Sequence, residues 1–556
     1  MKKIIFLLNV LIFALTVNAQ KVYTNPILAG FYPDPSICRV GNDYYIVNSS
    51  FAYFPGLPIF HSNDLVNWKQ IGHAMDRVEQ LDLKGAGVSR GLFAPTIRYN
   101  NGTYYIICTL IDKGGNFVIT AKDPKGPWSN PVWIKEVNGI DPSLYFDDNN
   151  KAYVLFNSIP PNNITLHDGH RTIRLFEFDA VNLKVTGKEI LLINGGTDMA
   201  KKPVWIEAPH IIKKDGWYYL ICAEGGTGYN HSEVVFRSKT VDGPYVSYEK
   251  NPILTQRHLS RERKNPITTT GHADFVETPD GRWYAVFLGC RPYEDDFYNI
   301  GRETFMTPVE WIDGWPVINP GFTEVQYRYP VPMPQLTKKM NNNFSGNLYY
   351  KDDFNNNILN QRFIFLRTVE NNLYSLSAQK GFLTLPLKLA TVSGNENPAF
   401  IGFRQQNLIC HASTAIDFNP SSENEKAGLL IFQNETHYYF LCKSTENNNQ
   451  VVQLFKSATK AGDNSELIAT QQLTTTKEIQ LKIEATGGNY AFYYAEKKNN
   501  WILLKDNVDG KFLSTKIAGG FVGSMFTLYG TSMGTPTTTI ARFNWFEYKG
   551  DDEVYR

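Results

Sequence analysis

Three acidic residues and one histidine occupy matching places in segments that are far apart along the chain. They are Asp34, Asp141, Glu207 and His272, each at or just before the start of an expected strand. A single Asp before a proline is commonly a turn former, so no one of them alone indicates function. Brought together, two carboxyl groups can act as a general acid and a general base if one stays protonated and the other ionised. A third carboxylate beside the acid would raise its pKa through like-charge repulsion.

Five segments share the pattern that would position these groups. Each has a short strand that opens near a Pro or Asp, a turn rich in Asp, Asn and Gly, and an aromatic strand. They are YPDPSICRVGNDYYIVNSS from Tyr32, FAPTIRYNNGTYYIICTL from Phe93, IDPSLYFDDNNKAYVLFNS from Ile140, EAPHIIKKDGWYYLICAE from Glu207 and HADFVETPDGRWYAVFLG from His272. Such turns between alternating runs are hairpin signals, and no convincing helical period appears up to about residue 330. The repeat predicts a five-bladed β-propeller, against the alternative of unrelated hairpins.

The innermost strand of each propeller blade lines the central channel, so equivalent positions of different blades meet on one axis. The three carboxylates and the histidine are therefore expected in one mouth. Carboxyl groups on either side of a sugar can break a glycosidic bond, which makes glycoside hydrolysis the chemistry that this set fits. Aromatic candidates for the walls, each of which could equally be core packing, are Phe51, Tyr53, Phe54, Phe93 and Trp205.

The first 330 residues also resemble a known family. The string NPILAGFYPDPSICRVGNDYYIVNSSFAYFPGLPIFHSNDLVNWKQIGHAM resembles the opening blade of glycoside hydrolase family 43, the β-xylosidase and α-L-arabinofuranosidase group. IDPSLYFDD, IEAPHI, GHADFVETPDGRWY and GRETF continue the resemblance in the same order. The resemblance implies a five-bladed propeller that hydrolyses glycosides with inversion at the anomeric carbon.

Roles for individual residues follow from the resemblance alone. Asp34 matches the general base, Glu207 the general acid, and Asp141 the residue that modulates the pKa of the acid and orients it. Arg302 of GRETF matches an arginine that contacts substrate hydroxyls. Inversion needs room for a water below the sugar, so the base and acid carboxyls are expected about 6.5–9.5 Å apart.

His272 matches the histidine at the channel bottom, and three interpretations of it stay open. It could be a hydrogen-bonded core histidine, could tune Asp34 through an ordered water, or could ligate a cation such as calcium, as in some relatives. No cofactor is required for the expected hydrolysis. Arg291, the other arginine of this region, is left open as a surface residue.

The second half of the chain has a different composition. The run YPVPMPQL reads as a linker, because proline favours extended backbone and interrupts regular pairing. We therefore expect a propeller over residues 20–335 and a second domain over 336–556. Its alternating strands predict a two-sheet sandwich and resemble the concanavalin-type β-sandwich that follows the propeller in many relatives. A loop around residues 521–525 could close the outer side of the pocket, or the domain could be a stabilising or carbohydrate-binding appendage.

An oligosaccharide or polysaccharide is the expected partner. An enclosed pocket would make the enzyme exo-acting on terminal β-D-xylose, α-L-arabinofuranose or both in xylan, arabinoxylan, xyloglucan or arabinan, and the second domain favours this mode. The alternatives are an endo-acting arabinanase or xylanase of the same family and a sugar-binding propeller without turnover. A third, a five-bladed family acting on fructosides, lacks support because its Asn-Asp-Pro and Glu-Cys motifs are absent.

The composition and the first residues of the chain limit its possible partners and its cellular location. Hydrophobic residues make up 42% and charged residues 20%, which is typical of a folded chain, and the net charge of +1 creates no field to attract nucleic acid. Lys2 and Lys3 precede an apolar run of about twelve residues, too short for a membrane span, so residues 1–19 are expected to be a signal peptide. We expect an exported protein without membrane attachment, in the periplasm first or secreted, from a Gram-negative bacterium. The six cysteines show no metal-ligand spacing, and most are expected to be buried.

Overall fold

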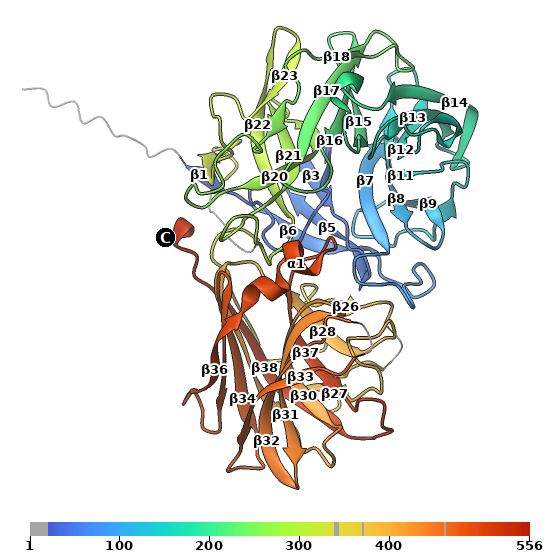
Figure 1. Cartoon of the computed structure of the whole chain (residues 1–556). Coiled ribbons are helices and arrows are strands. Elements are labelled where there is room, and N and C mark those ends of the chain that lie inside the picture. The colour runs from blue at the N-terminus through green and yellow to red at the C-terminus, as the bar shows by residue number, and fades with distance from the viewer. Residues whose placement is uncertain (1–20, 338–343, 370–371, 461–462) are drawn as a thin grey trace, which may run out of the picture.

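Two all-β units follow one another along the chain in the computed structural model (Figure 1). The structure describes residues 21–337, 344–369, 372–460 and 463–556, so the expected signal peptide lies outside the described residues. The last strand of the first unit ends at Pro330 and the first strand of the second begins at Tyr349. The expected boundary between residues 335 and 336 falls in the segment that connects them.

The first unit is a five-bladed β-propeller in which each blade is an antiparallel sheet whose four main strands are paired in chain order. The inner strands are β2 (Ser36–Val40), β7 (Leu92–Asn100), β11 (Ile140–Phe146), β15 (Glu207–Lys214) and β20 (Thr268–Glu277). The second strands are β3 (Asp43–Val47), β8 (Thr103–Leu110), β12 (Ala152–Ser158), β16 (Trp217–Glu224) and β21 (Trp283–Cys290). The third strands are β5 (Gly56–Ser62), β9 (Gly115–Ala121), β13 (Thr172–Asp179), β17 (Ser232–Ser238) and β22 (Glu303–Ile312). The outer strands are β6 (Lys69–Met75), β10 (Val132–Trp133), β14 (Lys184–Asn194), β18 (Val246–Ser247) with β19 (Leu254–Thr255), and β23 (Trp315–Ile318).

Tight turns and inter-blade packing explain why the repeat folds in this way. Asn101 and Gly102, between β7 and β8, have φ of 45° and 76°, the left-handed pair that a type I′ hairpin turn needs. Each inner strand contacts the inner strands of both neighbouring blades, so the five form a closed ring. The expected five-bladed propeller is confirmed.

Segments from the two ends of the propeller close the ring. β1 (Val22–Thr24) pairs with β24 (Arg328–Pro330), and Leu28 forms a bridge with Thr304 of β22. The side-chain amide of Asn25 donates to the carbonyl of Met306 at 2.8 Å. These contacts hold the segment that leads into the first blade against the fifth blade.

A buried ion pair joins opposite blades in the channel. Arg98 of β7 donates two hydrogen bonds, of 2.8 and 3.1 Å, to the carboxylate of Asp274 in β20. Ser36 of β2 also donates to Asp274, and His210 of β15 lies 3.0 Å from Arg98. Burial opposes ionisation of Asp274, but Arg98 outweighs it and lowers the pKa of Asp274 to about 2. Four blades thus share one charged network that fixes the inner strands.

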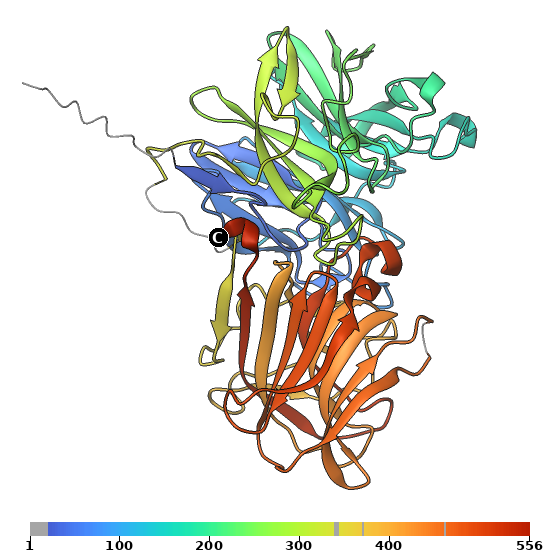
Figure 2. The same cartoon turned by 60° about the vertical axis from the view of Figure 1, so that its left-hand side comes forward.

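The second unit is a two-sheet sandwich whose layers are seen in Figure 2. The first sheet contains β25 (Tyr349–Asp352), β38 (Ile540–Gly550), β29 (Ile409–Asp417), β34 (Ile479–Thr486), β35 (Asn489–Ala495), β36 (Ile502–Asp509) and β27 (Leu383–Pro386). The second sheet contains β28 (Ala399–Arg404), β37 (Met525–Thr531), β30 (Lys426–Asn434), β31 (His437–Glu446), β32 (Asn449–Lys456) and β33 (Glu466–Gln472). Alternate residues of β30 and β34, such as Leu429 and Leu481, are fully buried in one core cluster, as a period of two requires. The expected sandwich is confirmed.

The two units are joined by paired backbone and buried charge. β4 (Tyr53–Phe54) of the propeller pairs with β26 (Phe365–Leu366) of the second unit. Arg291, left open as a surface residue, is 1% exposed and bonds to Glu303 of the propeller and Asp552 of the C-terminal segment. Without this arginine, each partner would be a buried carboxylate with no neutralising charge, which is unfavourable. Because the two partners belong to different units, the shared arginine holds the units together.

All six cysteines are free and buried, as most were expected to be. Among the described residues, no helix has the length and apolar character needed to cross a membrane.

Candidate active site

A pocket of about 520 Å³ opens at the mouth of the propeller channel. Eight of the ten side chains that the sequence indicated for the site line it: Asp34, Phe51, Phe93, Asp141, Trp205, Glu207, His272 and Arg302. Its other lining residues are Arg90, Ala94, Ile111, Ile140, Arg171, Gly226, Thr227 and Phe521. The expected convergence of residues from different blades is therefore observed.

Backbone distortion at or just before the start of β2, β11 and β15, and within β20, aims these side chains into the pocket. Asp34, Asp141 and His272 have φ of 52°, 52° and 56°, in the left-handed region that residues other than glycine seldom adopt. The pairing register shifts just after Ile140 and just after Glu207, which marks bulges in β11 and β15. A bulge redirects a side chain relative to its sheet, and strain of this kind is concentrated at functional sites.

Asp34 is buried and held as a carboxylate. Arg302 donates to its Oδ1 at 2.9 Å and Ser49 to its Oδ2 at 2.6 Å, while Nδ1 of His272 lies 3.7 Å from Oδ1. The Ser49 hydroxyl accepts from the Ala94 N–H, so its own proton is available for Asp34. Burial raises the pKa of Asp34, but Arg302, His272 and the Ser49 hydrogen bond outweigh it and lower the pKa below its ordinary value.

Glu207 has the opposite character in the same pocket. Burial first, and the negative charge of Asp34 second, raise the pKa of Glu207 to about 7, against smaller opposing effects of Arg302, Thr227 and Arg171. Thr227 donates to its Oε1 at 3.3 Å. Near neutral pH this carboxyl group therefore carries a proton much of the time, as a general acid must.

Asp141 is the third carboxyl group and is 7% exposed. Burial, followed by the charges of Glu207 and Asp34, holds the pKa of Asp141 well above its ordinary range. Asp141 and Glu207 repel each other when both are ionised, so this pair retains a proton when Asp34 is charged. The pKa of Glu207 itself is raised by burial and by Asp34, so the expected role of Asp141 as the modulator of Glu207 stays a prediction.

His272 is buried beside Asp34. Burial lowers the pKa of His272, although the charge of Asp34 opposes this shift. No set of three or more His, Cys, Asp or Glu side chains in the described part of the chain is placed to hold a metal ion. A cation near His272 remains an expectation from the resemblance.

Three phenylalanine rings wall one side of the pocket. Phe521, in the segment between α1 (Thr515–Ala518) and β37, stacks on Phe51 with ring centroids 6.0 Å apart and an angle of 18°. Phe93 meets both rings edge-on at 5.3 and 5.8 Å. The guanidinium of Arg302 lies 5.4 Å from the centroid of Phe521. The second domain thus completes the wall, which is one of the two interpretations left open for residues 521–525.

Trp205 lies on another part of the pocket lining and is covered by an arginine. The guanidinium of Arg171 stacks 4.0 Å from the centroid of Trp205, and both residues are partly exposed. A flat apolar face beside a cation suits the face and hydroxyls of a bound sugar.

Two of the aromatic candidates do not belong to the pocket lining. Tyr53 is fully buried and packs 5.4 Å from Phe31, and Phe54 lies in the core cluster shared with the second domain. Their backbone pairs with Phe365 and Leu366, so both side chains are directed by the domain junction and not by the channel.

Several lining residues escaped the sequence reasoning. Arg171 and Thr227 follow β12 and β16 in loops without a repeated position, and Arg90 precedes β7. The run GGTGYN around Thr227 contains no charged residue and no motif that would have indicated a site residue.

Comparisons with known proteins agree with this geometry. Residues 23–316 match the family described as Glycosyl hydrolases family 43, and residues 351–549 match a Beta xylosidase C-terminal Concanavalin A-like domain. A "Xylosidase/arabinosidase" of Butyrivibrio fibrisolvens is 38% identical over 94% of this chain and 99% of its own length. The "Non-reducing end alpha-L-arabinofuranosidase BoGH43B" of Bacteroides ovatus is 36% identical over 96% of this chain and 95% of its own. A solved structure described as a "GH43_12 retrieved from capybara gut metagenome" is 40% identical, with a TM-score of 0.85 over 92% of this chain and 95% of that one.

Proposed function

The chain belongs to glycosyl hydrolase family 43 and is a glycosidase, and from this premise we propose that it releases terminal β-D-xylose, α-L-arabinofuranose or both from hemicellulose oligosaccharides. The names of the two relatives in Butyrivibrio fibrisolvens and Bacteroides ovatus cover both sugars, which supports this range. The two sugars present similar hydroxyls around the scissile bond, so one pocket can accept either.

Exo-action is supported by the shape of the site. Phe521 of the second domain packs on Phe51 and Phe93 and blocks one side of the mouth. A groove for internal cleavage has to be open at both ends, whereas a blocked pocket of about 520 Å³ suits the terminal unit of a chain. The rest of the bound oligosaccharide would extend out of the pocket alongside Trp205 and Arg171, which are partly exposed.

In the proposed reaction Glu207 donates its proton to the glycosidic oxygen while the carbon–oxygen bond breaks. Asp34 accepts a proton from a water whose oxygen attacks the anomeric carbon from the opposite face. Attack from the face opposite to the leaving group inverts the anomeric configuration. Exchange with solvent then returns a proton to Glu207 and removes one from Asp34.

One observation carries this proposal: two carboxyl groups of one buried pocket have pKa values shifted in opposite directions. Arg302 and Ser49 keep Asp34 charged, whereas burial and that charge keep Glu207 protonated. Pairs of titratable groups separated in this way define a base and an acid. A sugar-binding pocket without turnover has no need of them.

The proposal is tested with purified full-length chain on arabinoxylan, arabinan and xylo-oligosaccharides. We expect xylose or arabinose as the first and dominant product, and proton NMR during early hydrolysis should show the inverted anomer. A ladder of internal fragments would favour the endo-acting alternative. No turnover of any substrate, including nitrophenyl xyloside and arabinofuranoside, would favour a sugar-binding protein.

A further inference from the structure

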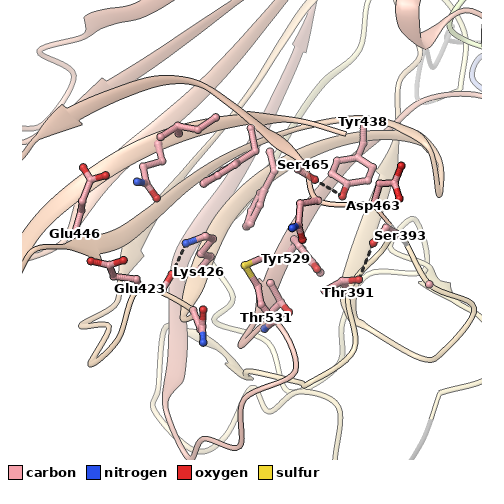
Figure 3. Close-up of a pocket in the computed structure, with 18 of the residues that line it drawn as sticks. Thr391, Ser393, Glu423, Lys426, Tyr438, Glu446, Asp463, Ser465, Tyr529 and Thr531 are labelled. Atoms are coloured by element: carbon pink, nitrogen blue, oxygen red, sulfur yellow. Dashed lines mark hydrogen bonds between the residues drawn. The ribbon is translucent and has the colours of Figure 1, made fainter. Parts of the chain in front are cut away.

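A second cavity, which we call the sheet pocket, lies on the outer face of the second sandwich sheet (Figure 3). Its volume is about 850 Å³, larger than the catalytic pocket, and the two share no lining residue. Strands β30, β31, β32, β33 and β37 supply half of the lining residues, and residues 391–395 supply one edge. The roles of the catalytic residues leave this cavity unexplained.

Aromatic rings form the floor of the sheet pocket. Phe440 of β31 faces Phe455 of β32 in the strand register, and its ring lies 4.8 Å from that of Tyr529. Tyr438, two residues before Phe440 and therefore on the same face of β31, donates or accepts a hydrogen bond with Ser465 at 2.8 Å. Phe455 is partly exposed, so it offers a ring face to an occupant.

A buried polar group without a partner adds a second, independent observation. Gln453 lines the sheet pocket and is 4% exposed, and its Oε1 has no hydrogen-bond donor among the described residues. Leaving a buried carbonyl oxygen unpaired is unfavourable, so its presence in a cavity lining points to a ligand that donates hydrogen bonds. Lys426, 8% exposed, lies 5.2 Å from the Phe455 ring and adds ammonium protons beside it.

The charged side chains around the sheet pocket favour neutral ligands over anionic ones. Glu423, Glu446 and Asp463 supply three carboxylates against the single ammonium of Lys426. Figure 3 shows Lys426 with Glu423 and Glu446 toward one end, and Asp463 with Tyr438 toward the other. A polyanion or an anionic lipid surface would be repelled, whereas carboxylates accept hydrogen bonds from neutral hydroxyls.

The floor of the sheet pocket is also connected to the catalytic site. Tyr438, Phe440 and Tyr529 belong to the same buried cluster as Phe51, and Phe521 packs against that cluster. One continuous aromatic layer therefore lies under the sheet pocket and behind the wall of the catalytic pocket.

We propose that the sheet pocket binds a neutral, pentose-rich segment of the polysaccharide whose terminal sugars the catalytic pocket removes. The ring faces would stack on Phe455, and the Gln453 side chain would turn so that its Oε1, which is buried in the structure, accepts from a sugar hydroxyl. The choice of this ligand rests on the proposed function. Binding here would hold the enzyme on the polymer without taking part in bond cleavage.

The test is native affinity electrophoresis of the full-length protein in gels that contain arabinoxylan or arabinan. The protein carries Asp34→Asn, so that it does not hydrolyse the polysaccharide. We expect the polysaccharide to slow migration, and Phe455→Ala or Gln453→Met to weaken this affinity about tenfold or more. Tyr493→Ala is the matched control, since this ring lies on β35 of the other sheet, against Lys482 at 4.4 Å. In the wild-type background all three substitutions should leave nitrophenyl glycoside turnover unchanged, which also verifies folding.

Each outcome separates the sheet pocket from the catalytic function. Equal retardation of Phe455→Ala, Gln453→Met and Tyr493→Ala would overturn the proposal that the sheet pocket binds polysaccharide. The proposal is also overturned if the Asp34→Asn protein is not retarded although the wild type hydrolyses the polymer. Retardation lost in the two pocket variants and kept in Tyr493→Ala supports it. The same pattern with a wild type that hydrolyses nothing would support the sheet pocket and contradict the proposed function.

Discussion

Arg302 of the propeller donates through Nη2 to the backbone carbonyl of Phe521 in the second domain, at 3.4 Å, while its Nη1 donates to Asp34. The same guanidinium lies 5.4 Å from the Phe521 ring. One side chain therefore connects the carboxylate proposed as the base with the wall that the sandwich supplies. The second domain therefore contributes Phe521 to the lining of the pocket at the propeller mouth.

Removing the Phe521 ring tests this closure. We expect Phe521→Ala to lower kcat/KM on oligosaccharides about tenfold, mainly through a higher KM, because an apolar wall of the sugar site becomes open to water. Phe322→Ala is the control, since Phe322 is 51% exposed and lines neither the catalytic pocket nor the sheet pocket. Equal kinetics for Phe521→Ala and the wild type would show that the ring contributes nothing to binding.

The acid assignment of Glu207 is tested by the choice of leaving group. Glu207→Ala should lower turnover by about 10²–10⁴-fold on xylo-oligosaccharides, whose alcohol leaving group needs a proton. On nitrophenyl glycosides the loss should be much smaller, because nitrophenolate leaves without one. Equal losses on the two substrate types would contradict the assignment.

The pH dependence of kcat/KM follows from the two pKa shifts. Glu207 must be protonated, and its pKa of about 7 means that activity is lost as pH rises through about 7. Asp34 must be ionised, and since its pKa is lowered from 3.8, the acidic limb should lie below pH 4. Arg171 lowers the pKa of Glu207, so Arg171→Ala should move the alkaline limb to higher pH. An alkaline limb that stays in place or moves down in this variant would argue against Glu207 as its origin.

Arg291 should dominate the stability of the domain junction. Arg291→Met leaves Glu303 and Asp552 buried without their shared cation, and we expect a loss of about 3–5 kcal/mol in the free energy of unfolding. Denaturant unfolding followed by fluorescence measures it. Lys351→Met, which removes an exposed pair with Asp353, is the control and should cost less than about 1 kcal/mol. Similar losses in both variants would show that the buried network is not stabilising.

The sequence predicted those site residues that occupy equivalent positions in the five repeated segments. Asp34, Asp141, Glu207 and His272 lie at corresponding or adjacent positions of the repeat, so the repeat alone predicts that they meet. For Tyr53 the sequence left core packing and a pocket wall both open, because an aromatic residue near an inner strand can face the channel or the neighbouring domain; its ring lies 6.2 Å from that of Phe400 in the second domain.

Other contributions depend on three-dimensional contacts that no local pattern encodes. Arg302 was indicated only by the family resemblance, since its position has no equivalent in the repeat. Arg171 reaches the pocket from a loop, and Phe521 comes from the other domain. The sheet pocket combines residues of five strands, and its unpaired Gln453 is recognised only from burial.

The most direct test of the central claim is the turnover of arabinofuranosyl and xylosyl substrates by Asp34→Asn, with the exposed Asp148→Asn as control. Asn keeps the size of the side chain but cannot take a proton from water, so we expect kcat to fall by about 10²–10⁴-fold with an unchanged fold. Asp148→Asn should retain full activity. If Asp34→Asn retained wild-type turnover, Asp34 would not be the base, and hydrolysis at this pocket would be contradicted.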